Sequence, residues 1–135
     1  ALCRKYKHTQ KFGWNIHKEN PIRKWVNDLF NGEENLFLVN FYSLAPGGWL
    51  FPHIDKHPDP HLNKIWVAIN WPDGNYFGFN GFGNVPITPR SVWLINNYQY
   101  THWVYNDSDQ YRLVLNIAGD LEQIKDIIYN NWIKN

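Results

Sequence analysis

The sequence contains no methionine and a single cysteine, Cys3, among its 135 residues. One cysteine excludes an internal disulfide framework and is typical of a reducing compartment, so we expect a cytoplasmic protein. Long apolar runs are also missing: the longest, Ile65 to Ile69, is far shorter than the ~20 residues that cross a bilayer. No segment resembles a signal peptide. The Asn-, Ile-, Lys- and Tyr-rich composition favours a microbial or viral source.

Neither sign of charge is in clear excess, because thirteen Lys and Arg residues balance twelve Asp and Glu residues to a net charge of +1. A dedicated nucleic-acid or membrane-surface binder would carry basic blocks or a basic stripe, so we expect neither partner. The length suits one domain spanning residues 1–135. These counts say nothing about oligomeric state.

Aromatic residues and asparagine are abundant, at 18% of the chain and eighteen residues respectively. Aromatic residues favour strands and asparagine favours turns, so the pair indicates a β-rich fold. Short strand-like segments separated by Gly, Pro and Asn clusters suggest a sandwich or barrel, with the jelly roll a leading candidate. The expected strands are residues 36–44, 49–54, 64–70, 76–79, 85–88, 91–95, 102–105 and 111–118.

Helices are expected on both sides of this β core, which spans about residues 36–120. Asn20 and Pro21 have the N-cap and N1 pairing of a helix start, so we expect a helix over about residues 20–31 that lies against a sheet. A second helix is expected over about residues 121–134, with Asp120 as its N-cap.

A His-x-Asp motif lies at the end of the strand expected over residues 49–54. Side chains alternate along a strand, so His53 and Asp55 point the same way and Ile54 points to the opposite face. An imidazole and a carboxylate on one face are two of the three ligands in a facial triad for Fe(II). His102, which opens another strand, is the candidate third ligand. The alternative is a hydrogen-bonded pair at a strand end.

His57 and His61 continue the series that starts at His53, with the four-residue spacing of a zinc-binding helix. Pro58 and Pro60 exclude a regular helix here, so the zinc interpretation fails. We expect a loop at the mouth of the site instead, in which the two histidines either contact substrate or are simply solvated.

Arg112 lies within an apolar strand and shares one face with Val114 and Asn116. A guanidinium among aliphatic side chains is costly to bury unless it meets an anion. A carboxylate ligand would satisfy the planar fork of Arg112 with two hydrogen bonds. The alternative is a structural ion pair with an Asp or Glu of the chain.

Two stretches together resemble the aspartyl/asparaginyl β-hydroxylase-like group of 2-oxoglutarate dioxygenases. Residues 44–55 read LAPGGxxxPHxD, which is similar to that group's iron-binding segment. Residues 93–113 read WLINNxxxxHxVxNxSxxxRL, which is similar to its second half. The resemblance spans about residues 36–120 and implies a double-stranded β-helix, the cupin-like jelly roll.

The same resemblance implies cofactors and roles for particular residues. Fe(II) would be held by His53, Asp55 and His102, and 2-oxoglutarate would place its distal carboxylate on Arg112. A further basic residue often begins the strand after the iron motif in this family, and Lys64 is the nearest candidate here. Tyr42 is a candidate hydrogen-bond donor to the co-substrate, the alternative being core packing. Ascorbate is a candidate accessory reductant.

The resulting expectation is a dioxygenase that hydroxylates an unactivated C–H bond of a small molecule or a peptide side chain. Two alternatives stay open. One is a cupin-like metal enzyme with the same three ligands that does not use 2-oxoglutarate. The other is a non-catalytic jelly-roll binding module, which explains the aromatic and asparagine content but gives no reason for His53, Asp55 and His102 to converge. Arg112 separates the first alternative, because such enzymes have no general need for an arginine facing the metal.

Overall fold

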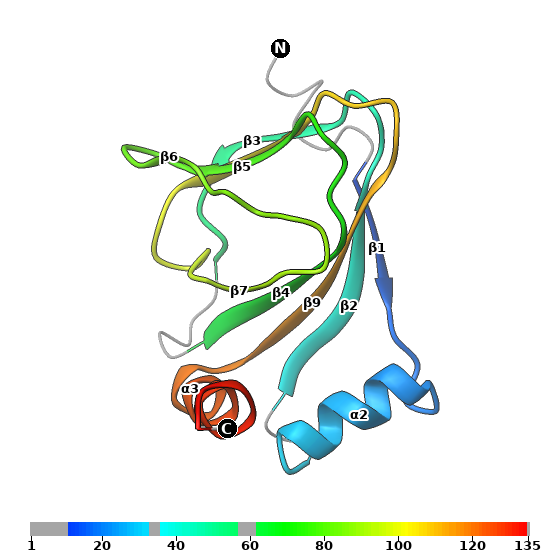
Figure 1. The fold of residues 1–135 in the computed structure, drawn as a ribbon, viewed down its shortest axis with the longest axis vertical. Helices are drawn as coiled ribbons and strands as arrows, with labels where there is room; N and C mark the ends of the chain where they lie inside the picture. Colours follow the sequence, from blue (N-terminus) through cyan, green and yellow to red (C-terminus); the bar gives the residue numbers. More distant parts are fainter. Residues whose placement is uncertain (1–10, 33–35, 57–61, 135) are drawn as a thin grey trace.

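Two antiparallel β-sheets face each other in a computed structural model that describes residues 11–32, 36–56 and 62–134 (Figure 1). The first sheet has five strands in the order β1 (Lys11–Asn15), β2 (Leu36–Leu44), β9 (Arg112–Asp120), β4 (Leu62–Asn70) and β7 (Val92–Ile95). The second has four strands in the order β3 (Trp49–His53), β8 (His102–Asn106), β5 (Asn75–Phe79) and β6 (Gly83–Asn84). This arrangement confirms the expected all-β core with flanking helices.

Side chains of β9 point alternately into the space between the two sheets and to the outer face of the first sheet. Val114 packs between the sheets in a buried cluster that includes Trp66 and Phe77. Leu115 and Ile117 belong to a different cluster, which also contains side chains of both helices. The face that carries Arg112 therefore points into the space between the sheets.

The turns on either side of β3 and β8 are tied together by Asn106, which is fully buried. Its side-chain amide donates to the carbonyl oxygens of Leu44 at 2.9 Å and Gln110 at 2.8 Å. Its backbone pairs with the turn that follows β2, through Gly47 N–H to Asn106 O at 2.8 Å and Asn106 N–H to Gly48 O at 2.9 Å. Gly47 has a φ of 71°, which glycine adopts without a Cβ penalty. These bonds hold β3 beside β8.

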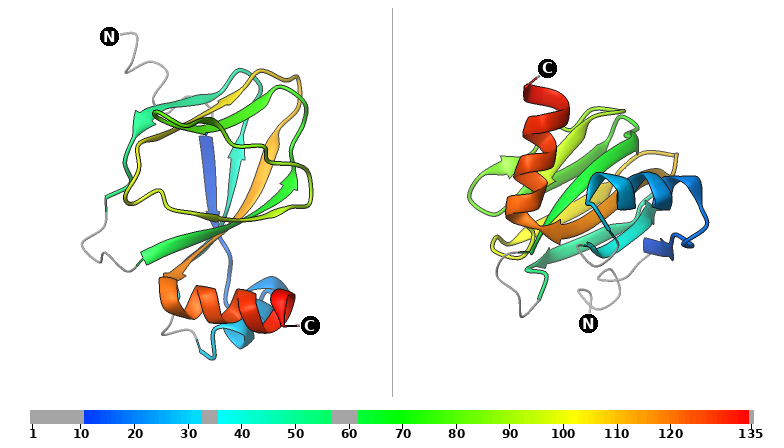
Figure 2. Two further views of the ribbon diagram at one scale, coloured as in Figure 1. Left: turned by 60° about the vertical axis from the view of Figure 1, so that its left-hand side comes forward. Right: turned by 90° about the horizontal axis from the view of Figure 1, so that it is seen from below.

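Helices α2 (Pro21–Leu29) and α3 (Leu121–Ile128) lie at one end of the first sheet, away from the second sheet (Figure 2). The expected N-caps are confirmed: Asn20 accepts from Ile22 N–H, and Asp120 accepts from the N–H groups of Glu122 and Gln123. Buried side chains of both helices pack on the outer face of β9 and β4. No helix in the described part of the chain is long and apolar enough to span a membrane.

One expected strand is absent, one observed strand was not expected, and the final helix extends as expected but changes type along its length. Residues 85–88 do not form a strand, because Pro86 cannot donate to a ladder and Ile87 N–H bonds to Val85 O at 2.8 Å within its own segment. The short strand β6 stands just before them. Strand β1 was missed, and the final helix changes from α3 to the π-helical turn η2 (Tyr129–Ile133).

Candidate metal centre

The register of β3 and β8 places His53 directly opposite His102. The two imidazole centroids are 4.3 Å apart, and Asp55 follows two residues after the end of β3. Asp55 Oδ1 lies 3.3 Å from His53 Nε2 and 3.6 Å from His102 Nε2. One ligand atom from each of the three residues lies within 4.8 Å of the other two. The three side chains therefore converge on one point, as a shared metal ion requires, although their role as ligands remains a prediction.

Each histidine ring is oriented by a backbone carbonyl two residues earlier. His53 Nδ1 lies 2.6 Å from the carbonyl oxygen of Phe51, and His102 Nδ1 lies 3.1 Å from that of Tyr100. A carbonyl oxygen can only accept, so Nδ1 donates in both rings and Nε2 is the nitrogen directed at the centre. Metal-binding histidines almost always have such a partner for the other ring nitrogen.

Asp55 is held by groups from two other segments. Its backbone N–H donates to the carbonyl oxygen of Asn97 at 3.0 Å. Its Oδ1 faces the histidines, while its Oδ2 contacts the ammonium group of Lys64. Burial alone would raise the pKa of Asp55, but the contact with His53 and the charge of Lys64 hold that pKa well below its usual range. Asp55 is therefore a carboxylate at neutral pH.

His102 is 3% exposed. Its burial lowers the pKa of His102 to about 4, against which the carbonyl of Tyr100 and the charge of Asp55 act in the opposite direction. The ring is consequently neutral at pH 7, which is the form that binds a metal.

Arg112 lines the same cavity as His53, Asp55 and His102, and it is 2% exposed. Its guanidinium carbon lies 5.7 Å from the ring centre of Trp66 and 5.0 Å from that of Trp71. Its Nε and Nη1 atoms are buried without a hydrogen-bond partner. No carboxylate in residues 11–32, 36–56 and 62–134 forms an ion pair with it, so the alternative of a structural ion pair finds no partner there. Burial lowers the pKa of Arg112 to about 9, which leaves the group positively charged at neutral pH.

One cavity joins the three converging side chains to Arg112. Its space is about 20 Å³, close to that of a single water, so side chains must move apart before a dicarboxylate can enter. The cavity brings together the predicted site residues of five strands and two residues of the intervening loops. Its lining consists of Tyr42, Leu50, His53, Asp55, Lys64, Trp66, Asn97, His102, Val104 and Arg112.

Sequence reasoning missed the contributions of Asn97 and Tyr98. Asn97 is 2% exposed, and its Oδ1 is buried in the cavity wall without a partner. The ring of Tyr98 lies 5.1 Å from Lys64 Nζ, and burial raises the pKa of Tyr98 to about 12. Nothing in a loop sequence marks such residues, because their place depends on how β7 returns to β8. His57 and His61 lie outside the described residues.

The donor set fits a divalent transition metal. Two imidazole nitrogens and one carboxylate oxygen are the donor set of the facial triad of non-haem Fe(II) proteins, which leaves further positions open. Arg112 has the free donors that a carboxylate at the far end of the cavity would satisfy. The donor chemistry of these residues therefore suits a divalent metal ion and, at Arg112, an anionic group, which can enter only once the side chains move apart.

Comparisons with known proteins bear on the fold. No protein-family model matches the chain, and no curated protein sequence matches it. Among solved structures, a predicted oxalate decarboxylase from Thermotoga maritima is similar with a TM-score of 0.54 at 18% identity, covering 82% of this chain and 81% of that one. A cupin domain of an XRE-family transcriptional regulator from Enterobacter cloacae has a TM-score of 0.57 at 12% identity, covering 82% and 97%. The Schizosaccharomyces pombe Cnp3 cupin domain has a TM-score of 0.55 at 11% identity, covering 88% and 72%.

The chain has the cupin double-stranded β-helix fold. Structures that share this cupin fold include a predicted enzyme and a domain of a transcriptional regulator. The fold alone therefore leaves the activity open, and function has to be argued from the site.

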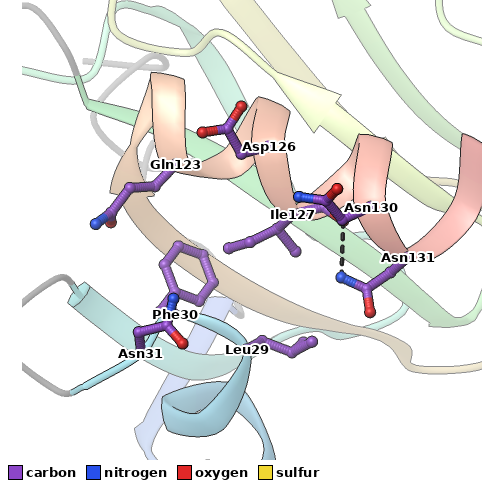
Figure 3. Close-up of a pocket in the computed structure, with 8 residues that line it drawn as sticks. All are labelled: Leu29, Phe30, Asn31, Gln123, Asp126, Ile127, Asn130 and Asn131. Carbon is purple, nitrogen blue, oxygen red and sulfur yellow. Dashed lines mark hydrogen bonds between the residues drawn. The ribbon is translucent and has the colours of Figure 1, made fainter. Parts of the chain in front are cut away.

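A second and larger cavity, of about 450 Å³, lies between α2 and the α3–η2 segment (Figure 3). Its described lining is mostly amide and aliphatic side chains with one carboxylate, Asp126. No histidine stands among these residues, so this cavity lacks the donor set for a transition metal. The candidate chemistry lies between the sheets, not between the helices.

Proposed function

We propose that this cupin-fold protein is an Fe(II)- and 2-oxoglutarate-dependent dioxygenase that hydroxylates an unactivated C–H bond of a small molecule or a peptide side chain. The observation that carries the proposal is the buried guanidinium of Arg112, whose Nε and Nη1 lack partners in the same cavity as the three converging ligands. A buried cation with unsatisfied donors calls for an anionic ligand.

His53, Asp55 and His102 would hold the iron, through His53 Nε2, Asp55 Oδ1 and His102 Nε2. Bound iron would supply the oxidising chemistry that couples the conversion of 2-oxoglutarate and O₂ into succinate and CO₂ to hydroxylation of the substrate's C–H bond. The chain's own contribution is geometric. The carbonyls of Phe51 and Tyr100 orient the two histidine rings, so these two of the three ligands are held in place before a metal binds.

Arg112 would bind the distal carboxylate of 2-oxoglutarate through its guanidinium, whose Nε and Nη1 lack hydrogen-bond partners. The rings of Trp66 and Trp71 lie beside the guanidinium and limit its rotation. Trp66 is itself fixed, because its indole N–H donates to Asn116 Oδ1 at 2.9 Å. Tyr42 lines the same cavity and is our candidate hydrogen-bond donor to the co-substrate. A planar fork held in this way selects a carboxylate over a neutral group of the same size.

The main alternative is a cupin-type metal enzyme that uses the same three ligands without 2-oxoglutarate. Similarity to a predicted oxalate decarboxylase favours this alternative, although at 18% identity it concerns the fold alone. A non-catalytic binding module is the second alternative, and a regulator's cupin domain is similar in fold. Neither alternative has a general need for an arginine in this cavity, although an anionic substrate of the first would also satisfy its unpartnered donors.

The proposal is tested by incubating the protein with Fe(II), ascorbate and 2-oxoglutarate and measuring succinate, with and without a panel of amino acids and short peptides. We expect iron-dependent succinate formation that is lost in His102→Ala and retained in the matched control His17→Ala, whose histidine is exposed and remote from the centre. Absence of succinate from iron-loaded protein over the whole panel would contradict the proposal. Consumption of oxalate without 2-oxoglutarate would favour the alternative enzyme.

A further inference from the structure

The two carboxylate oxygens of Asp55 have different partners. Oδ1 faces the metal-binding nitrogens, at 3.3 Å from His53 Nε2 and 3.6 Å from His102 Nε2. Oδ2 points away from them and contacts the ammonium group of Lys64. The carboxylate is therefore divided between the candidate metal position and a cation of the protein itself.

The side chain of Lys64 is buried at its contact with Asp55. It lies on β4, in register with Ala118 on β9 and Ile95 on β7, and its side chain is only 7% exposed. Its ammonium group stands 5.1 Å from the ring centre of Tyr98. An ammonium buried to this degree requires an anion. Asp55 is the anion that the described residues provide.

We propose that Lys64 is a positioning residue that restricts Asp55 to a single ligating oxygen. The inference rests on the metal site of the proposed function and deepens it. While Lys64 holds Oδ2, only Oδ1 can reach a metal, so the protein supplies three ligand atoms to a six-coordinate ion and leaves three positions open. Without Lys64, Oδ2 is free to bind the metal as well and to occupy a position that a bidentate co-substrate needs.

This role differs from the co-substrate contact that the family resemblance implies for Lys64. A lysine that binds the co-substrate affects 2-oxoglutarate affinity but leaves the metal's coordination unchanged while 2-oxoglutarate is absent. A lysine that restrains Asp55 changes the coordination before any co-substrate is added. The two roles are therefore separated by a measurement on the metal complex alone.

The experiment uses Mn(II), which is redox-stable in air and whose exchangeable water ligands are counted by water proton relaxation. The proteins are the parent, Lys64→Met, Lys64→Gln and the control Lys125→Met, whose lysine is exposed on α3. We expect relaxivity per bound Mn(II) to fall by about one third in Lys64→Met, from three open positions to two. Lys64→Gln should stay near the parent, because its amide N–H can still donate to Oδ2. Lys125→Met should match the parent.

A structure of the Mn(II)-loaded parent gives a test that does not depend on any variant folding. Coordination through Oδ1 alone, with Lys64 on Oδ2, supports the inference, and coordination through both oxygens overturns it. Equal relaxivity in the parent and Lys64→Met also overturns it, while leaving the metal site intact. Failure of the parent to bind Mn(II) or Fe(II) would instead contradict the proposed function.

Discussion

Replacing Arg112 should separate binding of 2-oxoglutarate from binding of the metal. Arg112 presents two buried donor nitrogens, Nε and Nη1, without hydrogen-bond partners. A charge-assisted hydrogen bond in such a place contributes on the order of 1.5–3 kcal/mol. Arg112→Lys keeps the charge and loses the fork, so 2-oxoglutarate affinity should fall roughly ten- to a hundredfold. Arg112→Met loses both contacts and the charge, so affinity should fall by more than about a hundredfold.

The assay is isothermal titration of 2-oxoglutarate into Mn(II)-loaded protein, with no oxidant chemistry to complicate it. Arg90→Lys is the matched control, because Arg90 is exposed on a turn. Metal affinity should be nearly unchanged in all three variants, since Arg112 contacts no candidate ligand. Equal binding of 2-oxoglutarate by the parent and Arg112→Met would refute the reasoning, and the cupin-type enzyme without 2-oxoglutarate would become the better account.

The ligand-free proteins provide an independent check on Arg112. A buried guanidinium without an anion destabilises the fold, so Arg112→Met should raise the free energy of unfolding by on the order of 1 kcal/mol or more. In Mn(II)-saturated protein, addition of 2-oxoglutarate at a hundred times the parent's dissociation constant should then stabilise the parent by about a further 2.7 kcal/mol and the variant hardly at all. An Arg112→Met protein that is much less stable than the parent without ligand would show that the group is structural.

Three other perturbations have defined outcomes. Asp55→Ala should abolish metal-dependent turnover and also lower the free energy of unfolding by about 3 kcal/mol, because Lys64 then lies buried without its anion. The double variant with Lys64→Met should recover stability in urea unfolding but not activity. Retained turnover in Asp55→Ala would contradict its role as a ligand. In the metal-free protein, His102 is protonated below about pH 6.5 in the unfolded chain but only below about pH 4 in the folded chain. The free energy of unfolding should therefore fall by about 3 kcal/mol as the pH is lowered from 6.5 to 4. His102→Gln should lose that part of the pH slope, and an unchanged slope would contradict the assignment. Gly78→Ala should destabilise by about 1–3 kcal/mol, since a Cβ would overlap the Trp103 ring and approach Gly83 O at 2.9 Å; a stability equal to the parent in urea would contradict this packing.

The pattern of alternation explains why much of the fold was predictable. Strand β9 could be divided into an inner and an outer face from the sequence, because Arg112, Val114 and Asn116 alternate with aliphatic residues. Helix caps at Asn20 and Asp120 were also predictable, because capping depends on residues that are neighbours in sequence. Strand β1 was missed because its sequence, KFGWN, contains a glycine and only two apolar residues.

The site was predictable only for residues whose type alone marks them as candidates for metal or anion binding. His53, Asp55, His102 and Arg112 stand out because imidazole, carboxylate and guanidinium groups are unusual within or beside strands that face a core. The partner of Lys64 was not predictable, because the contact with Asp55 depends on the distance between the two sheets. Asn97 was not singled out for the same reason: its backbone carbonyl meets Asp55 N–H only once β7 and β3 are brought together.

The central claim is that three side chains bind one metal ion, and equilibrium dialysis against Fe(II) without oxygen tests it most directly. The parent and the His17→Ala control should each bind one ion per chain. His53→Ala, Asp55→Ala and His102→Ala should each lose affinity by more than the roughly ten- to hundredfold that removal of an outer hydrogen-bond partner costs. Absence of bound iron in the parent, or parent-like binding by His102→Ala, would contradict the account.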